Sequence, residues 1–370
     1  MDIVKIIREA QKMRVSDIHI VFGLPIRIRK SGRLIDFDDH VLTDEDCDSI
    51  ARQLLGGTEM PVCGEIDSSG TFDGDIRCRL NLFRQQGHTS AAIRILSDRI
   101  PALDSLGLPE IVKTFTAYPR GIVIITGETG SGKSTTLAAL LDEINHTRQE
   151  HIITLEDPVE YIYKPDKCTI NQREIGTDTE TFDTGFRAIL REDPDVILVG
   201  EMRGLETIET ALVAAETGHL VFATLHTNSA ADTVDRIVNV FPGEKQQQIR
   251  LQLSMTLKAV VAQQLLPKKS GEGRALACEV MVLNSAIKNL IREGKTPQIE
   301  NSLATSAAEG NVTMDASLAK LVRSGTVSVE TAINAAHDPE FLSKLLGIAP
   351  PTPAAGNAHG TTVKERMRLY

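Results

Sequence analysis

GIVIITGETGSGKSTT, residues 121–136, joins a short β-branched run to a glycine-rich segment. Residues 122–125 predict a buried strand, and Gly127 to Ser134 fits the pattern G-x-x-x-x-G-K-[ST] without a mismatch. Because the three glycines of this segment lack a Cβ, the backbone can wrap an anion closely with its N–H groups pointing inward. The stretch therefore predicts a strand, a phosphate-binding loop and a helix, in that order.

The side chains of this loop have the chemistry that a bound nucleoside triphosphate requires. Lys133 would reach the terminal phosphates, and the Ser134 hydroxyl would ligate Mg²⁺. The helix that starts near Thr135 would direct the positive end of its dipole at the bound charge. The residues expected to bind nucleotide are Gly127, Glu128, Thr129, Gly130, Ser131, Gly132, Lys133, Ser134 and Thr135.

Length and composition limit the partners of the chain. Its 370 residues suggest two domains, and its net charge of −10 argues against general nucleic-acid binding, so no nucleic acid is expected as a partner. No apolar run approaches ~18 residues, and the amphipathic N-terminus carries charge throughout. We therefore expect a cytoplasmic protein with only peripheral membrane contact. The five scattered cysteines form no C-x-x-C pair and are expected to be reduced thiols.

The chain predicts an α/β protein with four parts. Residues 1–98 mix short helices with alternating strands and form an N-terminal α+β domain. Residues 99–112 contain prolines and glycine without periodicity, and we expect them to be the interdomain linker. Residues 113–346 form the phosphate-binding domain with a helical C-terminal part. Residues 347–370, rich in Pro, Ala and Gly, are expected to be a disordered tail.

The pattern after the phosphate loop alternates between strand and helix. Strand candidates at 151–155, 196–199 and 220–225 imply a mostly parallel sheet covered on both faces. In such sheets ligands bind at the carboxyl ends of the strands. From about residue 244 onward the pattern predicts helices at 244–265, 284–293, 314–324 and 328–336.

Carboxylates follow two of these strands. Glu201 ends the apolar run DVILVGE, where it would hold water on Mg²⁺ or polarise the attacking water. Glu156, Asp157 and Glu160 follow the first strand and would repel a polyphosphate unless Mg²⁺ or water lies between; a solvated loop is the alternative. We expect Ser134, Glu156 and Glu201 to hold Mg²⁺. Glu160 is the preferred activator of the lytic water, although the choice of general base between Glu160 and Glu201 stays open.

Two histidines and two arginines complete the candidate site. His226 lies at the carboxyl end of the strand at 220–225, where it would contact the γ-phosphate region, and His219 lies at the other end. An extended strand separates them by roughly 23 Å, which argues against one shared metal; a structural role is the alternative for both. Arg79 and Arg94 lie on polar faces of alternating strands. Oligomeric ATPases complete their sites with arginines from another domain or subunit, whereas a half-solvated sheet is the plain alternative.

Several segments together resemble a known family. From Asp17 to about Leu346 the chain resembles the secretion-type hexameric ATPases, and within them the retraction ATPases of type IV pili. The matching segments are GETGSGKSTT at 127–136, TLEDPVEY at 154–161, INQREIG at 170–176, LREDPDVILVGEMR at 190–203, AAETGHLVFATLHT at 214–227 and AIKNLIRE at 286–293.

The resemblance implies a PAS-like N-terminal domain, a RecA-like P-loop ATPase core and a homohexameric ring that hydrolyses ATP with Mg²⁺. The family roles that it implies here are phosphate and Mg²⁺ binding for Lys133 and Ser134, an acidic Asp box of Glu156, Asp157 and Glu160, the Walker B carboxylate for Glu201, a His box of His219 and His226, and arginine fingers for Arg79 and Arg94.

Two features place the resemblance on the retraction side. The sequence has no tetracysteine zinc element, and AIKNLIRE is similar to the AIRNLIRE motif of retraction ATPases. The resemblance thus implies a motor that acts on an inner-membrane pilus platform protein, at the inner-membrane face, to disassemble pilin. The alternatives are an ATPase of a related type II or type IV secretion or conjugation machine, and a monomeric P-loop kinase for a small acceptor.

The sequence also departs from the family pattern. Glu128 stands where the family commonly has Pro, and it would add a negative charge beside the phosphates. Lys288 replaces the motif's Arg and loses a planar bidentate donor. Ile287, Leu290 and Ile291 share one helical face, for which core packing is the alternative to partner binding.

Overall fold

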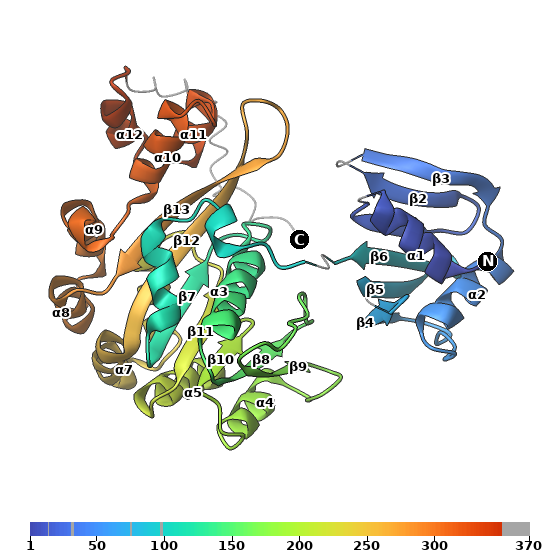
Figure 1. Ribbon diagram of the computed structural model, residues 1–370, viewed down its shortest axis with the longest axis horizontal. Coiled ribbons are helices and arrows are strands. Elements are labelled where there is room, and N and C mark those ends of the chain that lie inside the picture. The colour runs from blue at the N-terminus through green and yellow to red at the C-terminus, as the bar shows by residue number, and fades with distance from the viewer. Residues whose placement is uncertain (14, 31–32, 75, 97–98, 350–370) are drawn as a thin grey trace, which may run out of the picture.

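The computed structural model describes residues 1–13, 15–30, 33–74, 76–96 and 99–349. An N-terminal body and a larger body lie side by side along the longest axis (Figure 1). The disorder expected for residues 347–370 concerns mainly 350–370, which lie outside the described residues. We propose that residues 99–112 link two domains, because the strands of the first sheet end at Ile95 and those of the second begin at Gly121.

The N-terminal body is a six-stranded antiparallel sheet with two helices. Its elements are α1 (Ile3–Lys12), β1 (Asp17–Ile20), β2 (Pro25–Lys30), β3 (Arg33–Val41), α2 (Asp44–Leu54), β4 (Glu65–Phe72), β5 (Ile76–Gln85) and β6 (His88–Ile95). The strand order is β3-β2-β1-β6-β5-β4. Along β5 every second residue from Ile76 to Leu82 is buried, so Arg77 and Arg79 share the opposite, polar face. The predicted alternation and the α+β class are confirmed.

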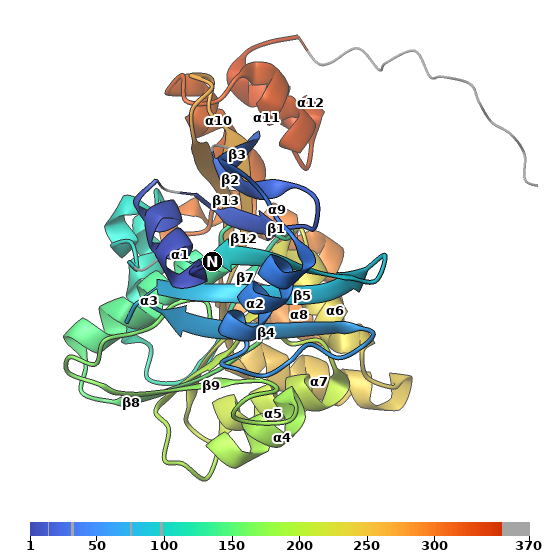
Figure 2. The same cartoon turned by 90° about the vertical axis from the view of Figure 1, so that its right-hand side faces the viewer.

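The larger body is built on a seven-stranded sheet. Its strands are β7 (Gly121–Thr126), β8 (His151–Glu156), β9 (Thr169–Glu174), β10 (Val196–Val199), β11 (Leu220–Leu225), β12 (Leu257–Pro267) and β13 (Arg274–Val282). The order is β13-β12-β7-β11-β10-β8-β9, and all neighbours are parallel except β12 and β13. In Figure 2 the N-terminal sheet lies in front of this body, with β4 near β9.

Helices surround this sheet. They are α3 (Lys133–Thr147), α4 (Phe182–Ile189), α5 (Leu205–Glu216), α6 (Ala230–Asn239), α7 (Gly243–Thr256), α8 (Ser285–Glu293), α9 (Ile299–Thr305), α10 (Met314–Arg323), α11 (Val329–Ala335) and α12 (Pro339–Leu346). Short 3₁₀ segments are η1 (Leu103–Ser105), η2 (Glu110–Ala117), η3 (Thr296–Gln298) and η4 (Ala307–Glu309). Within the described parts of the chain, no helix is both long and apolar enough to cross a bilayer.

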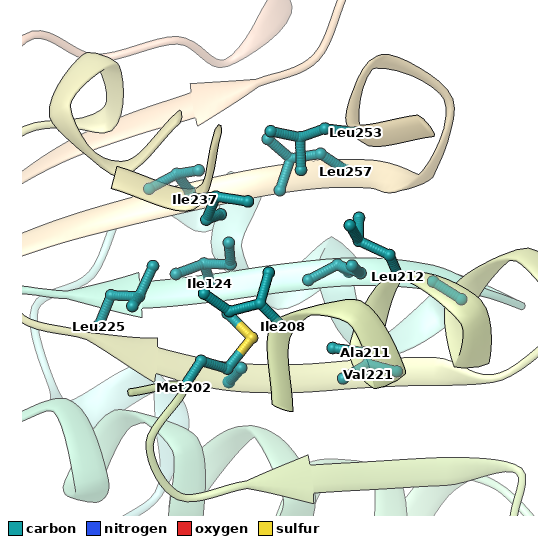
Figure 3. Close-up of a cluster of buried hydrophobic side chains, with 14 of the residues drawn as sticks. Ile124, Met202, Ile208, Ala211, Leu212, Val221, Leu225, Ile237, Leu253 and Leu257 are labelled. Atoms are coloured by element: carbon teal, nitrogen blue, oxygen red, sulfur yellow. The ribbon is translucent and has the colours of Figure 1, made fainter. Parts of the chain in front are cut away.

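The core explains why β7 is apolar without alternation. Ile122 and Ile124 belong to a hydrophobic cluster that includes α5, α6 and α7, part of which Figure 3 shows. Val123 and Ile125 belong to a second cluster that includes α3 and η2. A strand with helices on both faces has no solvent side, so every position is apolar. The doubly covered parallel sheet predicted from the sequence is confirmed, with the phosphate loop at the carboxyl end of a central strand.

The helix predicted at 244–265 is wrong in its second half. Helix α7 ends at Thr256, and β12 begins at Leu257 between β7 and β13. Residues 257–266 are a mostly apolar run that is buried on both faces, and periodicity alone does not separate such a strand from a buried helix. The partner strand β13 lies within residues 266–283, for which no element was predicted.

The C-terminal helices confirm the other helix predictions, since α8, α10 and α11 occupy the expected positions. Helices α10, α11 and α12 pack with Leu266, Ala275 and Ala277 at one end of the β12–β13 pair. In α8, which carries AIKNLIRE, Ile287 and Ile291 are fully buried in the main core. The apolar face of this motif therefore packs inside the protein.

Candidate active site

The phosphate loop connects β7 to α3 in a conformation that requires glycine. Gly127, Gly130 and Gly132 have φ values of 138°, 82° and 92°, in the left-handed region that disfavours other residues. A Cβ on Gly127 would also collide with the carbonyl oxygen of Gln263 on β12. The loop is thus held tightly against the neighbouring strand, with its curved backbone at the start of α3.

Lys133 already turns back over the loop. Its Nζ donates hydrogen bonds to the carbonyl oxygens of Gly127, at 2.8 Å, and Glu128, at 3.0 Å. Burial lowers the pKa of Lys133, while the carboxylates of Glu201 and Glu160 oppose that shift. The ammonium group therefore lies in an acidic, half-buried cavity at the point where an anion can replace the carbonyl partners.

One cavity of 490 Å³ brings most of the predicted site together. The predicted residues that line it are Arg79, Arg94, Thr129, Gly130, Gly132, Lys133, Ser134, Thr135, Glu156, Asp157, Glu160, Glu201 and His226. A larger cavity of 710 Å³ lies on the other side of the loop and is lined by Glu128 and Ser131, together with Thr129 and Gly130. Glu128 thus lines this second cavity, whereas the residues that line the 490 Å³ cavity do not include it.

Glu201 stands directly after β10 with two cationic or titratable neighbours. Its Oε1 lies 2.8 Å from Nε of Arg203 and 3.5 Å from Nε2 of His226. The hydrogen bond from Arg203 lowers the pKa of Glu201; burial works in the opposite direction, and His226 adds a smaller lowering effect. Glu201 is thus an ionised carboxylate facing Lys133 across the cavity.

Glu156 has the opposite electrostatic character. Burial raises its pKa to about 7, although hydrogen bonds from Thr154, at 2.7 Å, and Gln172, at 3.5 Å, favour the carboxylate. A buried carboxyl of this kind gains from a cation that replaces its proton. Ser134, Glu156 and Glu201 line one cavity, and side chains with oxygen ligands suit Mg²⁺. Among the described residues no group of three or more His, Cys, Asp or Glu is placed to hold a metal ion.

The raised pKa of Glu156 predicts how stability depends on pH without nucleotide or metal. Because the pKa is about 7 in the folded protein and ordinarily 4.5, the folded state binds more protons between these values. The free energy of unfolding therefore falls as the pH rises through this window, and Glu156→Gln should remove that fall. Urea unfolding in EDTA at about pH 5, 6 and 7 measures it. Asp157→Asn is the control, since Asp157 is exposed; equal slopes in wild type and Glu156→Gln would contradict the assignment.

The two predicted histidines lie at opposite ends of β11. His226 follows β11 on the nucleotide side, beside Glu201. His219 precedes β11, so it lies at the opposite edge of the parallel sheet, where its Nδ1 is 2.9 Å from the carbonyl oxygen of Ala214. Of the two, only His226 lines the cavity that contains the phosphate loop.

Arg79 and Arg94 lie next to each other on β5 and β6, as paired residues in the antiparallel register. Nε of Arg94 donates to Asp17 Oδ1 at 2.9 Å, and the Arg94 side chain is 65% exposed. Both arginines line the same cavity as Lys133. Within one chain, therefore, the N-terminal body supplies two cations to the site.

Sequence reasoning missed three residues that contact the site. Arg203 bonds Glu201, the Tyr161 hydroxyl lies 2.9 Å from Thr135 Oγ1, and Nη1 of Arg274 donates to the carbonyl oxygen of Gly130 at 3.3 Å. Arg203 and Tyr161 belong to segments already identified by resemblance, so the signal was present for them. Arg274 begins an unpredicted strand and carried no motif.

The fold and the phosphate loop define a P-loop protein of the ATPase class, in which residues of the N-terminal body line the same cavity as the loop. The chain matches the family described as Type II/IV secretion system protein over residues 1–334, and it belongs to that family.

Two named relatives and one solved structure are similar to this chain over three quarters of its length or more. The chain is 43% identical, over 92% of its length and 99% of the relative's, to the Pseudomonas aeruginosa protein named type IV pilus retractation ATPase PilT. It is 47% identical to a Neisseria gonorrhoeae protein named twitching motility protein, over 75% of each chain. A crystal structure described as the pilus retraction motor PilT with bound ADP superposes with a TM-score of 0.85 at 44% identity, covering 93% of this chain and 99% of that one. The secretion-type ATPase class predicted from the sequence is confirmed.

Proposed function

We propose that this protein is the ATP-hydrolysing motor that retracts type IV pili and so powers twitching motility. The observation that carries the proposal is the single cavity in which the phosphate loop, the strand-end carboxylates and two arginines of the N-terminal body meet. The names of the two relatives and of the solved structure support the choice of pilus retraction within the family.

The side chains divide the chemistry of ATP hydrolysis among them. Lys133 exchanges its two carbonyl partners for the terminal phosphates, which are stronger acceptors. Ser134, Glu156 and Glu201 would hold Mg²⁺, which when bound would neutralise charge on the phosphates. Glu160 or Glu201 orients the attacking water and accepts its proton. Cofactor requirements are accordingly ATP and Mg²⁺.

Arg79 and Arg94 make hydrolysis depend on the position of the N-terminal body. They stabilise the charge that develops on the transferred phosphoryl group, so the active site is complete only when this body lies over it. The angle between the two bodies then follows the nucleotide state, with residues 99–112 as the hinge. In a homohexamer at the cytoplasmic face of the inner membrane, successive subunits would move the pilus platform protein and disassemble pilin.

A clean deletion of the gene tests the biological assignment. We expect twitching to be lost and surface pili to accumulate, because assembly continues without disassembly. Cells without pili would indicate an assembly motor and contradict the proposal. Normal twitching with a secretion or conjugation defect would favour the alternative, a related type II or type IV machine.

Assembly state separates the motor from a small-molecule kinase. A homohexamer is expected to elute in gel filtration at six times the 40.3 kDa subunit mass. A species near 40.3 kDa that binds nucleotide and phosphorylates a small acceptor would favour the monomeric P-loop kinase instead.

Lys133→Ala tests the nucleotide site directly. We expect ATP to bind about tenfold to a hundredfold more weakly, because a charge-assisted hydrogen bond to the terminal phosphates is lost. Lys164→Ala is the matched control, since Lys164 is exposed on the same body and does not line the cavity. Fluorescent-nucleotide titration measures both variants, and an unchanged affinity for Lys133→Ala would contradict the site.

A further inference from the structure

Glu174 joins the two bodies through one buried carboxylate. It is the last residue of β9, and its side chain is 8% exposed. From the N-terminal body, Nη2 of Arg77 donates to Oε2 at 2.6 Å, and the Ser69 hydroxyl donates to Oε1. From the larger body, the Val159 N–H donates to Oε2 at 3.1 Å and Thr177 Oγ1 donates to Oε1 at 3.4 Å. Both oxygens therefore bind both bodies.

The donors on the N-terminal side lie next to the arginine pair. Arg77 and Arg79 are two residues apart on β5, so they share a face of the sheet and move together. Ser69 on β4 is the register partner of Arg79 and also accepts a hydrogen bond from Arg77 at 2.6 Å. Holding Arg77 on Glu174 thus fixes the strand that carries Arg79 into the nucleotide cavity.

The donor on the larger body lies in the acidic loop. Val159 is buried and immediately precedes Glu160, and Asp157 and Pro158 come before it. Asp157, Pro158 and Glu160 all line the nucleotide cavity. The hydrogen bond from the Val159 N–H to Glu174 therefore fixes the backbone that places Glu160.

We propose that the Arg77–Glu174 pair is a positioning link that sets the arginine strand and the acidic loop in register for hydrolysis; this rests on the proposed function. Neither residue lines the nucleotide cavity, so the pair acts through its neighbours and does not touch the nucleotide.

The energetics of the pair favour a positional role. Removing two charges from water costs much of what their attraction returns, so a buried ion pair contributes little net stability. Among the described residues, Arg77 Nε is buried without a hydrogen-bond partner, which adds to that cost. What the pair does provide, together with the Ser69 hydroxyl, is a short, directional connection between the two bodies.

Kinetics on three variants test the link. Arg77→Met, Glu174→Gln and the double variant should each lower the kcat for ATP hydrolysis by about 10-fold to 100-fold, the cost of misplacing catalytic groups by about 1 Å. The dissociation constant for ADP should stay within about threefold, since the phosphate loop is untouched. The double variant should lose no more activity than the worse single variant, because both remove one interaction. Arg77→Lys, which keeps the charge, should retain more activity than Arg77→Met.

A neighbouring ion pair gives a matched control. Arg173 immediately precedes Glu174, and its Nη1 lies 2.8 Å from Glu192 Oε1. Both residues of this pair belong to the larger body. Arg173→Met should leave kcat within about twofold, as expected for a partly exposed pair, 22% and 38% exposed, that does not join the two bodies. An equal loss of kcat in Arg173→Met and Arg77→Met would show a general effect of disturbing β9 and overturn the proposal.

Hydrogen exchange tests the coupling without any hydrolysis. In the nucleotide-free protein, Arg77→Met changes only the N-terminal body, yet it should raise amide exchange at residues 157–161, which it does not touch. Unchanged exchange there, in Arg77→Met and in Glu174→Gln, would overturn the link even if the wild type is a fully active ATPase. If the wild type hydrolyses no ATP but Arg77→Met still raises exchange at residues 157–161 relative to it, the link is supported while the proposed function fails. If Arg77→Met does not fold, the isosteric Glu174→Gln decides both measurements.

Discussion

Arg79→Ala is expected to lower the kcat for ATP hydrolysis by about 10³-fold or more, which is the lower end of the range for an arginine that stabilises phosphoryl transfer. Arg79 lines the cavity that contains Lys133 and Glu201, although it belongs to the other body. The loss should fall on kcat, with ATP affinity changed less than about tenfold, because the charge that the arginine meets develops in the transition state. Single-turnover hydrolysis measures the effect.

The control for Arg79→Ala is Arg27→Ala. Arg27 lies on β2 of the same sheet, where its Nε is 2.9 Å from Asp36 Oδ1, and it does not line the cavity. Its removal should leave kcat within about twofold, as for other exposed ion pairs. A kcat for Arg79→Ala within threefold of wild type would contradict the assignment.

Mixing variants shows whether Arg79 acts within its own subunit. Arg79 and the phosphate loop of one chain line a common cavity. Mixed rings of Arg79→Ala and Lys133→Ala subunits should therefore stay inactive, because no chain carries both groups. Recovered activity would mean that the arginine acts on a neighbouring subunit.

Glu201→Gln should lower kcat by about 10²-fold to 10⁴-fold, the range for a group that handles the water proton or holds its metal. Glutamine fills the same space and still accepts from Arg203, so ATP binding should change little. The protein should then hold unhydrolysed ATP, and filter binding with labelled ATP detects this state.

Glu206→Gln is the matched control for Glu201→Gln. Glu206 lies near the start of α5, exposed, with its Oε2 2.8 Å from Arg187 Nη2. It should retain full activity. If Glu201→Gln keeps more than a third of the wild-type kcat while Glu160→Gln loses it, Glu160 is the general base and the role given to Glu201 is wrong.

The sequence pattern predicted those parts of the site whose geometry depends only on residues that are close together in the chain. The phosphate loop needs only the residues of one turn, and a carboxylate at the end of an apolar strand reaches the nucleotide edge wherever the sheet is parallel. Glu201 and Glu156 were therefore found from residues alone. The close approach of Gly127 to Gln263 was not predicted, because Gln263 lies on β12, a strand for which the sequence pattern predicted a helix.

Contacts between segments that lie far apart in the chain could not be predicted from the sequence pattern. Arg77 and Glu174 are 97 residues apart, and each by itself resembles an ordinary charged residue on a strand. Arg274 and Gly130 are 144 residues apart and meet only because β13 pairs with β12 beside the loop. Resemblance supplied roles for Arg79 and Arg94, whereas their placement over the phosphate loop of the same chain required the structure.

The register that sets Arg79 opposite Arg94 has an electrical consequence for the work cycle. Like charges directly opposite one another on neighbouring strands repel, so an anion between them acts as a counterion that holds the N-terminal body down. Hydrolysis and phosphate release remove part of that negative charge. Because both arginines belong to the N-terminal body, we expect their attraction to the nucleotide then to weaken, so that this body is held less firmly over the site. ATP would thus both supply the energy of the cycle and hold the N-terminal body over the site, and its hydrolysis would release that body.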